Sequence, residues 1–183
     1  MDSFVTIEAS KISGESIYSD GVVIANNGYY YYVITDGNVF SALKGQRDIR
    51  YKVKDSKASE YDAIAASVMD EESGLLLLRV NLSGEKDIAM KEVSMGDISS
   101  LVGHISNIEQ INKLKLIDNI KTNTIIFDDV SFNSYILNDN STIKGAIISR
   151  DNKLCGIYLS KYNSYVEANL IRYILKTTYS LDL

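Results

Sequence analysis

The sequence contains no proline and no tryptophan, and it has a single cysteine, Cys155, and a single histidine, His104. One cysteine excludes an internal disulfide and a cysteine-rich metal site. One histidine removes most zinc chemistry and restricts acid–base catalysis near neutral pH. We therefore expect a chain that uses no metal and no cofactor.

Long apolar runs and an excess of positive charge are also missing. No run approaches the ~20 apolar residues of a membrane span, and the opening Met-Asp-Ser-Phe has neither the basic nor the apolar region of a signal peptide. The formal net charge of −5 argues against nucleic acid or an anionic membrane as the main partner. The 183 residues, 45% of them hydrophobic, suffice for one globular domain with a buried core.

Short strand patterns separated by turns run through most of the chain. The strongest turn signal is Asn26-Asn27-Gly28, which lies between apolar runs at residues 21–25 and 29–34. Asparagine and glycine accept the positive φ of a tight hairpin. Other strand-like runs occur at residues 4–8, 49–53, 63–69, 75–80, 113–117, 124–127, 143–149 and 154–159. Such closely spaced strands predict an all-β sandwich or barrel.

One helix is predicted, at the end of the chain, over about residues 164–178. Its apolar positions recur at helical spacing, and Ser164-Tyr165-Val166-Glu167 fits a capping box at its start. The apolar face consists of Val166, Leu170, Ile171, Ile174 and Leu175. An amphipathic helix of this kind is expected to close a β-domain.

Three segments carry a resemblance to a known family through their order and spacing. They are Ile34-Thr35-Asp36-Gly37-Asn38-Val39, Ser73-Gly74-Leu75-Leu76-Leu77-Leu78-Arg79-Val80 and Ser141-Thr142-Ile143-Lys144-Gly145-Ala146. Together with Ser19-Asp20-Gly21-Val22-Val23-Ile24 and Met95-Gly96-Asp97-Ile98, they resemble the signatures of the HtrA-type branch of trypsin-like serine proteases. The resemblance covers residues 4–159, is weakest at 105–137, and is followed by no PDZ domain.

The resemblance implies a chymotrypsin-like fold of two six-stranded β-barrels with a C-terminal helix. All 183 residues would then form one protease-fold domain. Its barrel halves would span roughly residues 1–85 and 86–160. Proteins of this family usually act outside the cytoplasm, so an extracytoplasmic, cell-envelope location is expected, with a possible membrane tether outside this chain.

The same resemblance places Asn38 at the position of the catalytic histidine, Gly74 at the aspartate and Ile143 at the serine. A serine protease needs a nucleophile, a base within hydrogen-bond reach and a group that orients the base. Isoleucine has no nucleophilic atom, the asparagine amide is no useful base, and glycine orients nothing. Lys144 also replaces a glycine of the oxyanion loop. We therefore expect a pseudoprotease with no enzymatic activity.

Other polar residues offer weaker alternatives. Ser141 and Thr142 lie beside the vacated site without an identifiable activating partner, and turn chemistry is their expected role. Cys155 lies in a strand-like run, where small buried cysteines are common. His104 is expected to be structural or to lie at the surface. A hydrolase with a site rebuilt from these groups is the alternative hypothesis.

The four tyrosines at positions 29–32 offer aromatic area to a partner, because alternate residues of a strand face opposite sides. Packing against loops of the first barrel is the competing interpretation. The candidate binding residues are Tyr29, Tyr31, Ser141, Thr142 and Lys144.

The expected function is a protein- or peptide-binding, or regulatory, module at the cell envelope. It would hold a partner in the former substrate cleft or by strand addition to a sheet edge. A structural assembly domain within an envelope complex is a further alternative.

Overall fold

The computed structural model of the chain describes residues 2–43, 48–81, 88–96, 103–106, 115–116, 120–137, 145–149 and 153–183. The chain divides into two compact units, Met1–Val93 and Ser94–Leu183. The boundary between these units follows Val93, and the barrel halves expected from the resemblance span roughly residues 1–85 and 86–160.

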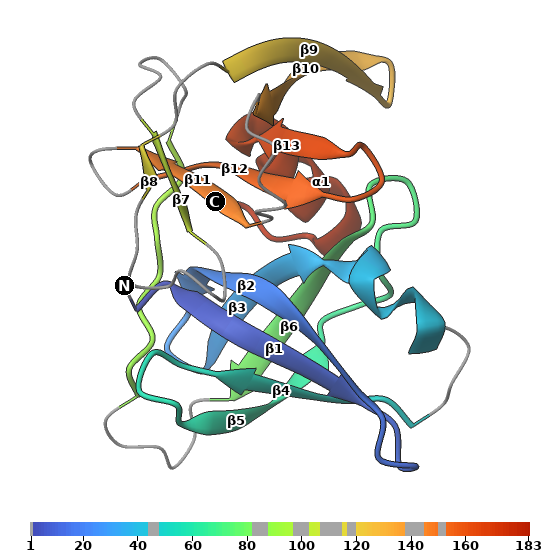
Figure 1. Cartoon of the computed structure of the whole chain (residues 1–183), viewed down its shortest axis with the longest axis vertical. Helices are drawn as coiled ribbons and strands as arrows, with labels where there is room; N and C mark the ends of the chain where they lie inside the picture. The colour runs from blue at the N-terminus through green and yellow to red at the C-terminus, as the bar shows by residue number, and fades with distance from the viewer. Residues whose placement is uncertain are drawn as a thin grey trace. The chain divides into compact units, whose positions relative to one another are not determined.

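The first unit is a closed barrel of six antiparallel strands (Figure 1). The strands are β1 (Phe4–Ser10), β2 (Ser16–Asn26), β3 (Tyr30–Asp36), β4 (Arg50–Lys54), β5 (Glu60–Ala65) and β6 (Leu75–Asn81). Their order around the barrel is β1-β2-β3-β6-β5-β4, and β4 pairs again with β1. A 3-10 helix, η1 (Gly37–Leu43), follows β3 directly.

The barrel core comes from alternate residues of these strands, as the period-2 pattern of a strand requires. Val5, Ile7, Val33, Leu78 and Val80 are all almost fully buried in one hydrophobic cluster. Gly21 belongs to the same interior, where a Cβ would lie 2.7 Å from Ile7 Cδ1 and 2.8 Å from Val33 Cγ1. Close packing, and no unusual backbone angle, therefore explains this glycine of the resemblance motif.

The predicted hairpin at Asn26-Asn27-Gly28 is confirmed. It joins β2 to β3, and Gly28 adopts a φ of +87°. The Asn27 side-chain oxygen accepts hydrogen bonds from the amides of Tyr29 at 2.9 Å and Tyr30 at 2.8 Å. The asparagine thus supplies the turn with an acceptor as well as a tolerant backbone.

The second unit contains a seven-stranded sheet in the order β8-β7-β11-β12-β13-β10-β9. Its strands are β7 (Gly103–Ser106), β8 (Lys115–Leu116), β9 (Ile120–Phe127), β10 (Val130–Leu137), β11 (Ala146–Ser149), β12 (Leu154–Leu159) and β13 (Ser164–Glu167). All seven pair in antiparallel fashion. The two edge strands, β8 and β9, are consecutive in the chain.

The terminal helix α1 spans Ala168–Tyr179 and packs against β12, β13 and β10. The predicted start at Ser164 and its capping box are wrong, because Ser164–Glu167 forms strand β13 and Glu167, the N-cap residue, makes no side-chain cap hydrogen bond. The Glu167 carboxylate instead accepts the Asn133 amide at 2.8 Å. Sheet pairing of Tyr165 and Val166 with β12 and β10 therefore wins over local helix signals.

The all-β class predicted from the strand pattern is confirmed: the described chain is mostly strand, with a closed barrel, a second sheet and a C-terminal helix. Among the residues that the structure describes, no helix is both long and apolar enough to span a bilayer.

Candidate functional site

Asn38 lies at the exit of β3, where the chain turns into η1. The last residue of β3, Asp36, is paired with Leu75 of β6, and its carboxylate accepts the Asn38 amide at 3.3 Å. The intervening Gly37 donates its amide to the Gly74 carbonyl at 2.7 Å. A Cβ on Gly37 would lie 2.5 Å from Met69 Sδ and 2.9 Å from that carbonyl oxygen, so only glycine allows this approach.

Gly74 ends a tight turn that leads into β6. Its φ is +78°, in the left-handed region that glycine adopts without strain. The turn is fixed by the Asp70 carbonyl, which accepts the Gly74 amide at 2.7 Å, and by the Asp70 carboxylate, which accepts both the amide and the hydroxyl of the buried Ser73. The acidic stretch from Asp70 thus caps its own turn, and the described residues include no cluster suited to a metal ion.

The structure brings Asn38 and Gly74 together. A Cβ built on Gly74 would lie 2.6 Å from Asn38 Nδ2 and 3.0 Å from its Cγ. The asparagine amide therefore occupies the space where a side chain at position 74 would begin. The absence of a side chain at Gly74 leaves the space that the Asn38 amide fills.

The chemistry available at this pair is narrow. An amide is neither a general base nor a general acid near neutral pH, and glycine offers no carboxylate to orient one. The carboxylate of Asp36, a residue that is only 6% exposed, accepts the backbone amide of Asn38. This end of the first barrel holds two of the three positions predicted from the sequence, and neither carries a group that activates a nucleophile.

The third position, Ile143, lies outside the described residues, as do Ser141, Thr142 and Lys144. The next described residue, Gly145, has a φ of +155°, and its carbonyl accepts the Tyr158 amide at 2.8 Å. The structure thus fixes the strand that follows the third segment, β11, and leaves the four residues as candidates from the sequence.

Ser19 and Thr35, which belong to two of the resemblance motifs, have a structural role. Thr35 is fully buried, and its hydroxyl donates to the Asp20 carbonyl at 2.7 Å and lies 3.1 Å from the Ser19 hydroxyl. These contacts cross-link β2 to β3 next to the Gly21–Thr35 backbone pair. Because buried hydroxyls need hydrogen-bond partners, these contacts hold β3 in place, and Asn38 follows directly after that strand.

Cys155 and His104 are placed in the second unit. The Cys155 thiol is 3% exposed and donates to the Lys153 carbonyl at 3.5 Å. Burial and a hydrogen bond to a backbone carbonyl fit a packing role for this side chain. His104 is a residue of β7, paired with Ile148 of β11 and Leu116 of β8.

The tyrosine run divides between the two faces of β3. Tyr31 packs against the barrel core, and burial together with the nearby Glu92 charge raises the pKa of its hydroxyl. Tyr30 and Tyr32 face outward, with ring centroids 6.5 Å apart. Tyr29, in the hairpin turn, is 75% exposed. Of the two tyrosines selected from the sequence, Tyr29 is thus open to solvent, and Tyr31 is partly buried against the core.

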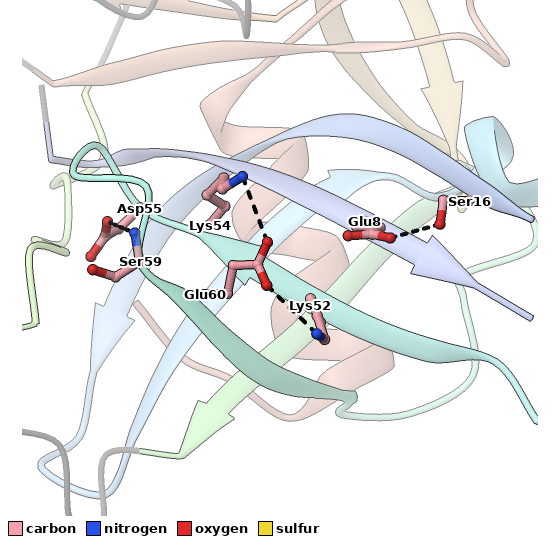
Figure 2. Close-up of polar contacts among 7 residues, drawn as sticks. All are labelled: Glu8, Ser16, Lys52, Lys54, Asp55, Ser59 and Glu60. Carbon is pink, nitrogen blue, oxygen red and sulfur yellow. Dashed lines mark hydrogen bonds and ion pairs between the residues drawn. The ribbon is translucent and has the colours of Figure 1, made fainter. Parts of the chain in front are cut away.

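Sequence reasoning missed Asp55, a buried carboxylate in the turn between β4 and β5. Its Oδ1 accepts the amide of Ser59 (Figure 2) and the amide of Lys57, both at 2.9 Å. Its Oδ2 accepts the Tyr61 hydroxyl at 2.8 Å and the Ala89 amide at 3.4 Å. Asp55 thus ties a hairpin to a distant segment, and the signal available in the sequence was an Asp-Ser turn between two strand patterns.

It also missed Arg79, a cation within the apolar run of β6. Its neighbours Leu78 and Val80 belong to the core, so Arg79 faces outward, and its guanidinium carbon lies 4.9 Å from the Tyr30 ring centroid. The signal was the charge itself, since one arginine in a run of leucine and valine marks the side of the strand that does not face the core.

Comparison of the chain with models of protein families and with curated proteins gives no match.

Proposed function

We propose that this chain is a catalytically inactive relative of the HtrA-type serine proteases that binds a protein or peptide in place of cleaving it. The observation that carries the proposal is the Asn38–Gly74 pair. Its amide fills the place where an acidic side chain would begin, 2.6 Å from the Cβ position of Gly74. Two positions taken from separate sequence motifs thus meet at one end of one barrel, without a base.

The strand order of the second unit supports a double barrel. When β8 and β9 are taken as two parts of one strand, the second sheet follows the circular order β7-β8/9-β10-β13-β12-β11. The first barrel follows β1-β2-β3-β6-β5-β4, the same sequence of first, second, third, sixth, fifth and fourth strands. Two units with one topology are what a chymotrypsin-like double barrel requires.

The proposed mode of binding is strand addition, in which a partner extends a sheet through main-chain hydrogen bonds. The closed first barrel offers no edge for this. The second sheet differs, because its strand β8 pairs with β7 at only two positions, Lys115 and Leu116, and none of the described strands pairs with the outer side of β9 (Ile120–Phe127). Ile126 on that strand is 61% exposed, so it presents apolar surface beside the free edge.

Enzymatic inactivity is tested with an active-serine probe and an unfolded casein-like substrate. The unmodified protein is expected to give neither labelling nor cleavage, and Ile143→Ser alone is expected to give no hydrolysis, because position 38 supplies no base. Cleavage by the unmodified protein, abolished by replacing Ser141, Thr142 or Cys155, would establish the rebuilt hydrolase instead.

Binding is tested separately, with the same unfolded polypeptide labelled for fluorescence anisotropy. Ile126→Lys places a charge beside the β9 edge and is expected to weaken binding. The matched control is Ile12→Lys, at a position that is 69% exposed in a turn of the first unit. If both changes act equally, or if the polypeptide does not bind, strand addition at β9 is wrong. The proposed envelope location is tested by fractionating cells that express the full-length protein.

A further inference from the structure

The outer face of the first barrel carries a row of side chains across four neighbouring strands, β3, β6, β5 and β4. Backbone register places Tyr32 of β3 opposite Arg79 of β6, and Arg79 opposite Ile64 of β5. Tyr51 of β4 is paired with Ala63, so the preceding residue, Arg50, lies opposite Ile64. We call Arg50, Ile64, Arg79, Tyr30 and Tyr32 the arginine row. None of them belongs to the Asn38–Gly74 pair or to β9.

Arg79 is held in place by an aromatic ring and has no anionic partner among the residues that the structure describes. Its guanidinium lies over the Tyr30 ring at 4.9 Å, a cation–π contact that fixes the side chain before any ligand arrives. Its Nε is buried, and within the described part of the chain no acceptor reaches it. A guanidinium supplies five donors in a planar fork that suits a carboxylate.

The lysines of the same face, unlike the arginines, have an anionic partner within the sheet. Lys52 and Lys54 both form ion pairs with Glu60 (Figure 2), and in each pair the ammonium nitrogen lies 3.6 Å from a carboxylate oxygen. No ion pair or hydrogen bond from a described residue is recorded for Arg50 or Arg79. The lysine charges are therefore partly matched inside the sheet, and the arginine charges are left for an external anion.

Between the two arginines lies an apolar surface, Ile64, which is 51% exposed. Adjacent strands are about 4.8 Å apart, so the backbones of Arg50 and Arg79, two strands apart, are about 10 Å apart. That separation suits two carboxylates with an apolar group between them better than one phosphate that draws both cations. The net charge of −5 also opposes a polyanion such as nucleic acid.

We propose that the arginine row is a docking surface for an acidic, partly apolar peptide segment of a protein partner. The carboxylates of the segment bind Arg79 and Arg50, and its apolar side chains cover Ile64 and Tyr32. Tyrosine and arginine are the residue types that dominate binding energy at protein interfaces. The surface is separate from the proposed binding edge and does not require it.

The test uses a short fluorescein-labelled peptide of alternating glutamate and leucine, with fluorescence anisotropy as the measurement. Arg79→Gln and Arg50→Gln are each expected to raise the Kd about tenfold, or about 1.4 kcal/mol. The controls are Lys52→Gln and Lys54→Gln, which remove the same charge from the same face and are expected to change the Kd less than about twofold. Arg79→Lys keeps the charge but loses the planar fork, so it is expected to weaken binding as well.

Any one of the following outcomes overturns the proposal. The unmodified protein does not bind the peptide, a peptide with glutamine in place of glutamate binds equally well, or the lysine variants weaken binding as much as the arginine variants. Tighter binding of a phosphoserine version shows a phosphate ligand and also overturns it. Arg50 is exposed at a strand end, so its variant stays informative if Arg79→Gln fails to fold. Ile126→Lys must leave this binding intact, which separates the inference from strand addition at β9.

Discussion

Replacing Asp55 with alanine should be among the most damaging single substitutions in the first barrel. The carboxylate is 5% exposed and accepts four hydrogen bonds, from Lys57, Ser59, Tyr61 and Ala89. These contacts join the β4–β5 turn to the segment before Val93. Alanine removes the acceptor and leaves the donors in place.

The size of the effect follows from which donors water can reach. The amides of Lys57 and Ser59 belong to exposed residues and can bind water instead. Tyr61 and Ala89 are each 8% exposed, so their donors lose an acceptor inside the protein. A buried donor without its acceptor costs about 1–3 kcal/mol, which gives about 2–6 kcal/mol for the two. A domain's free energy of unfolding is typically about 5–15 kcal/mol, so this cost is a large part of it.

The assay is urea unfolding followed by circular dichroism, with hydrogen exchange of the β4 and β5 amides to assign the loss to this barrel. Asp55→Asn keeps one acceptor oxygen and is expected to cost less than Asp55→Ala. Asp62→Ala, on the exposed face of β5, is the matched control and should stay within about 0.5 kcal/mol of the parent protein. If Asp55→Ala is as stable as Asp62→Ala, the carboxylate is not the tie described above.

Three further predictions concern single sites. Gly74→Ala should destabilise the barrel by about 1–3 kcal/mol because of its positive φ and the nearby Asn38 amide, and thermal unfolding should show a smaller cost on an Asn38→Ala background. Gly21→Ala should cost about 1–3 kcal/mol by overpacking, seen as a lower urea midpoint with an unchanged slope. Burial, the Glu167 charge and Cys155 raise the pKa of Tyr135 from 10.0 to about 12, so the folded chain keeps a proton that the unfolded chain loses. The free energy of unfolding should therefore fall as pH rises from 10.0 to about 12, and it should fall less steeply in Tyr135→Phe. In an absorbance titration of tyrosine, the same variant should lack the late phase of the parent protein.

The strands that sequence analysis found are those with plain local signals. β2 and β3 were recognisable from the Asn-Gly turn, and β6 from its apolar run. β5 begins earlier than predicted, at Glu60, because its outward residues are charged, while the predicted end included Val68, which is 76% exposed outside the strand. Apolar content alone misjudged which residues pair.

β10 and β13 were missed because their signals are indirect. The turn before β10 consists of Asp128 and Asp129 at φ values of +47° and +61°, and aspartate announces a positive φ less clearly than glycine does. β13 carries a helix-like apolar spacing, and only pairing with strands distant in sequence makes it a strand. Such long-range pairing cannot be read from a local window.

At the candidate site, motif order selected Asn38 and Gly74, and their contact depends on strand pairing that the local sequence does not show. Asn38 and Gly74 are adjacent because β3 pairs with β6 and because Gly37 approaches the Gly74 carbonyl. Arg79 stayed unnoticed because its meaning depends on Tyr30, which reaches it across the strand pair.

The adjacency also bears on whether a catalytic site can be rebuilt by substitution. An aspartate at position 74 would need its Cβ where the Asn38 amide now lies, and it would need to hold a φ of +78°. A histidine at position 38 is larger than the asparagine and would compete for the same space. Each replacement therefore obstructs the other unless the turn from Asp70 changes its backbone, and its hydrogen bonds to Ser73 and Gly74 oppose that change. For this reason the triple variant Asn38→His, Gly74→Asp, Ile143→Ser is expected to remain without hydrolytic activity toward the casein-like substrate.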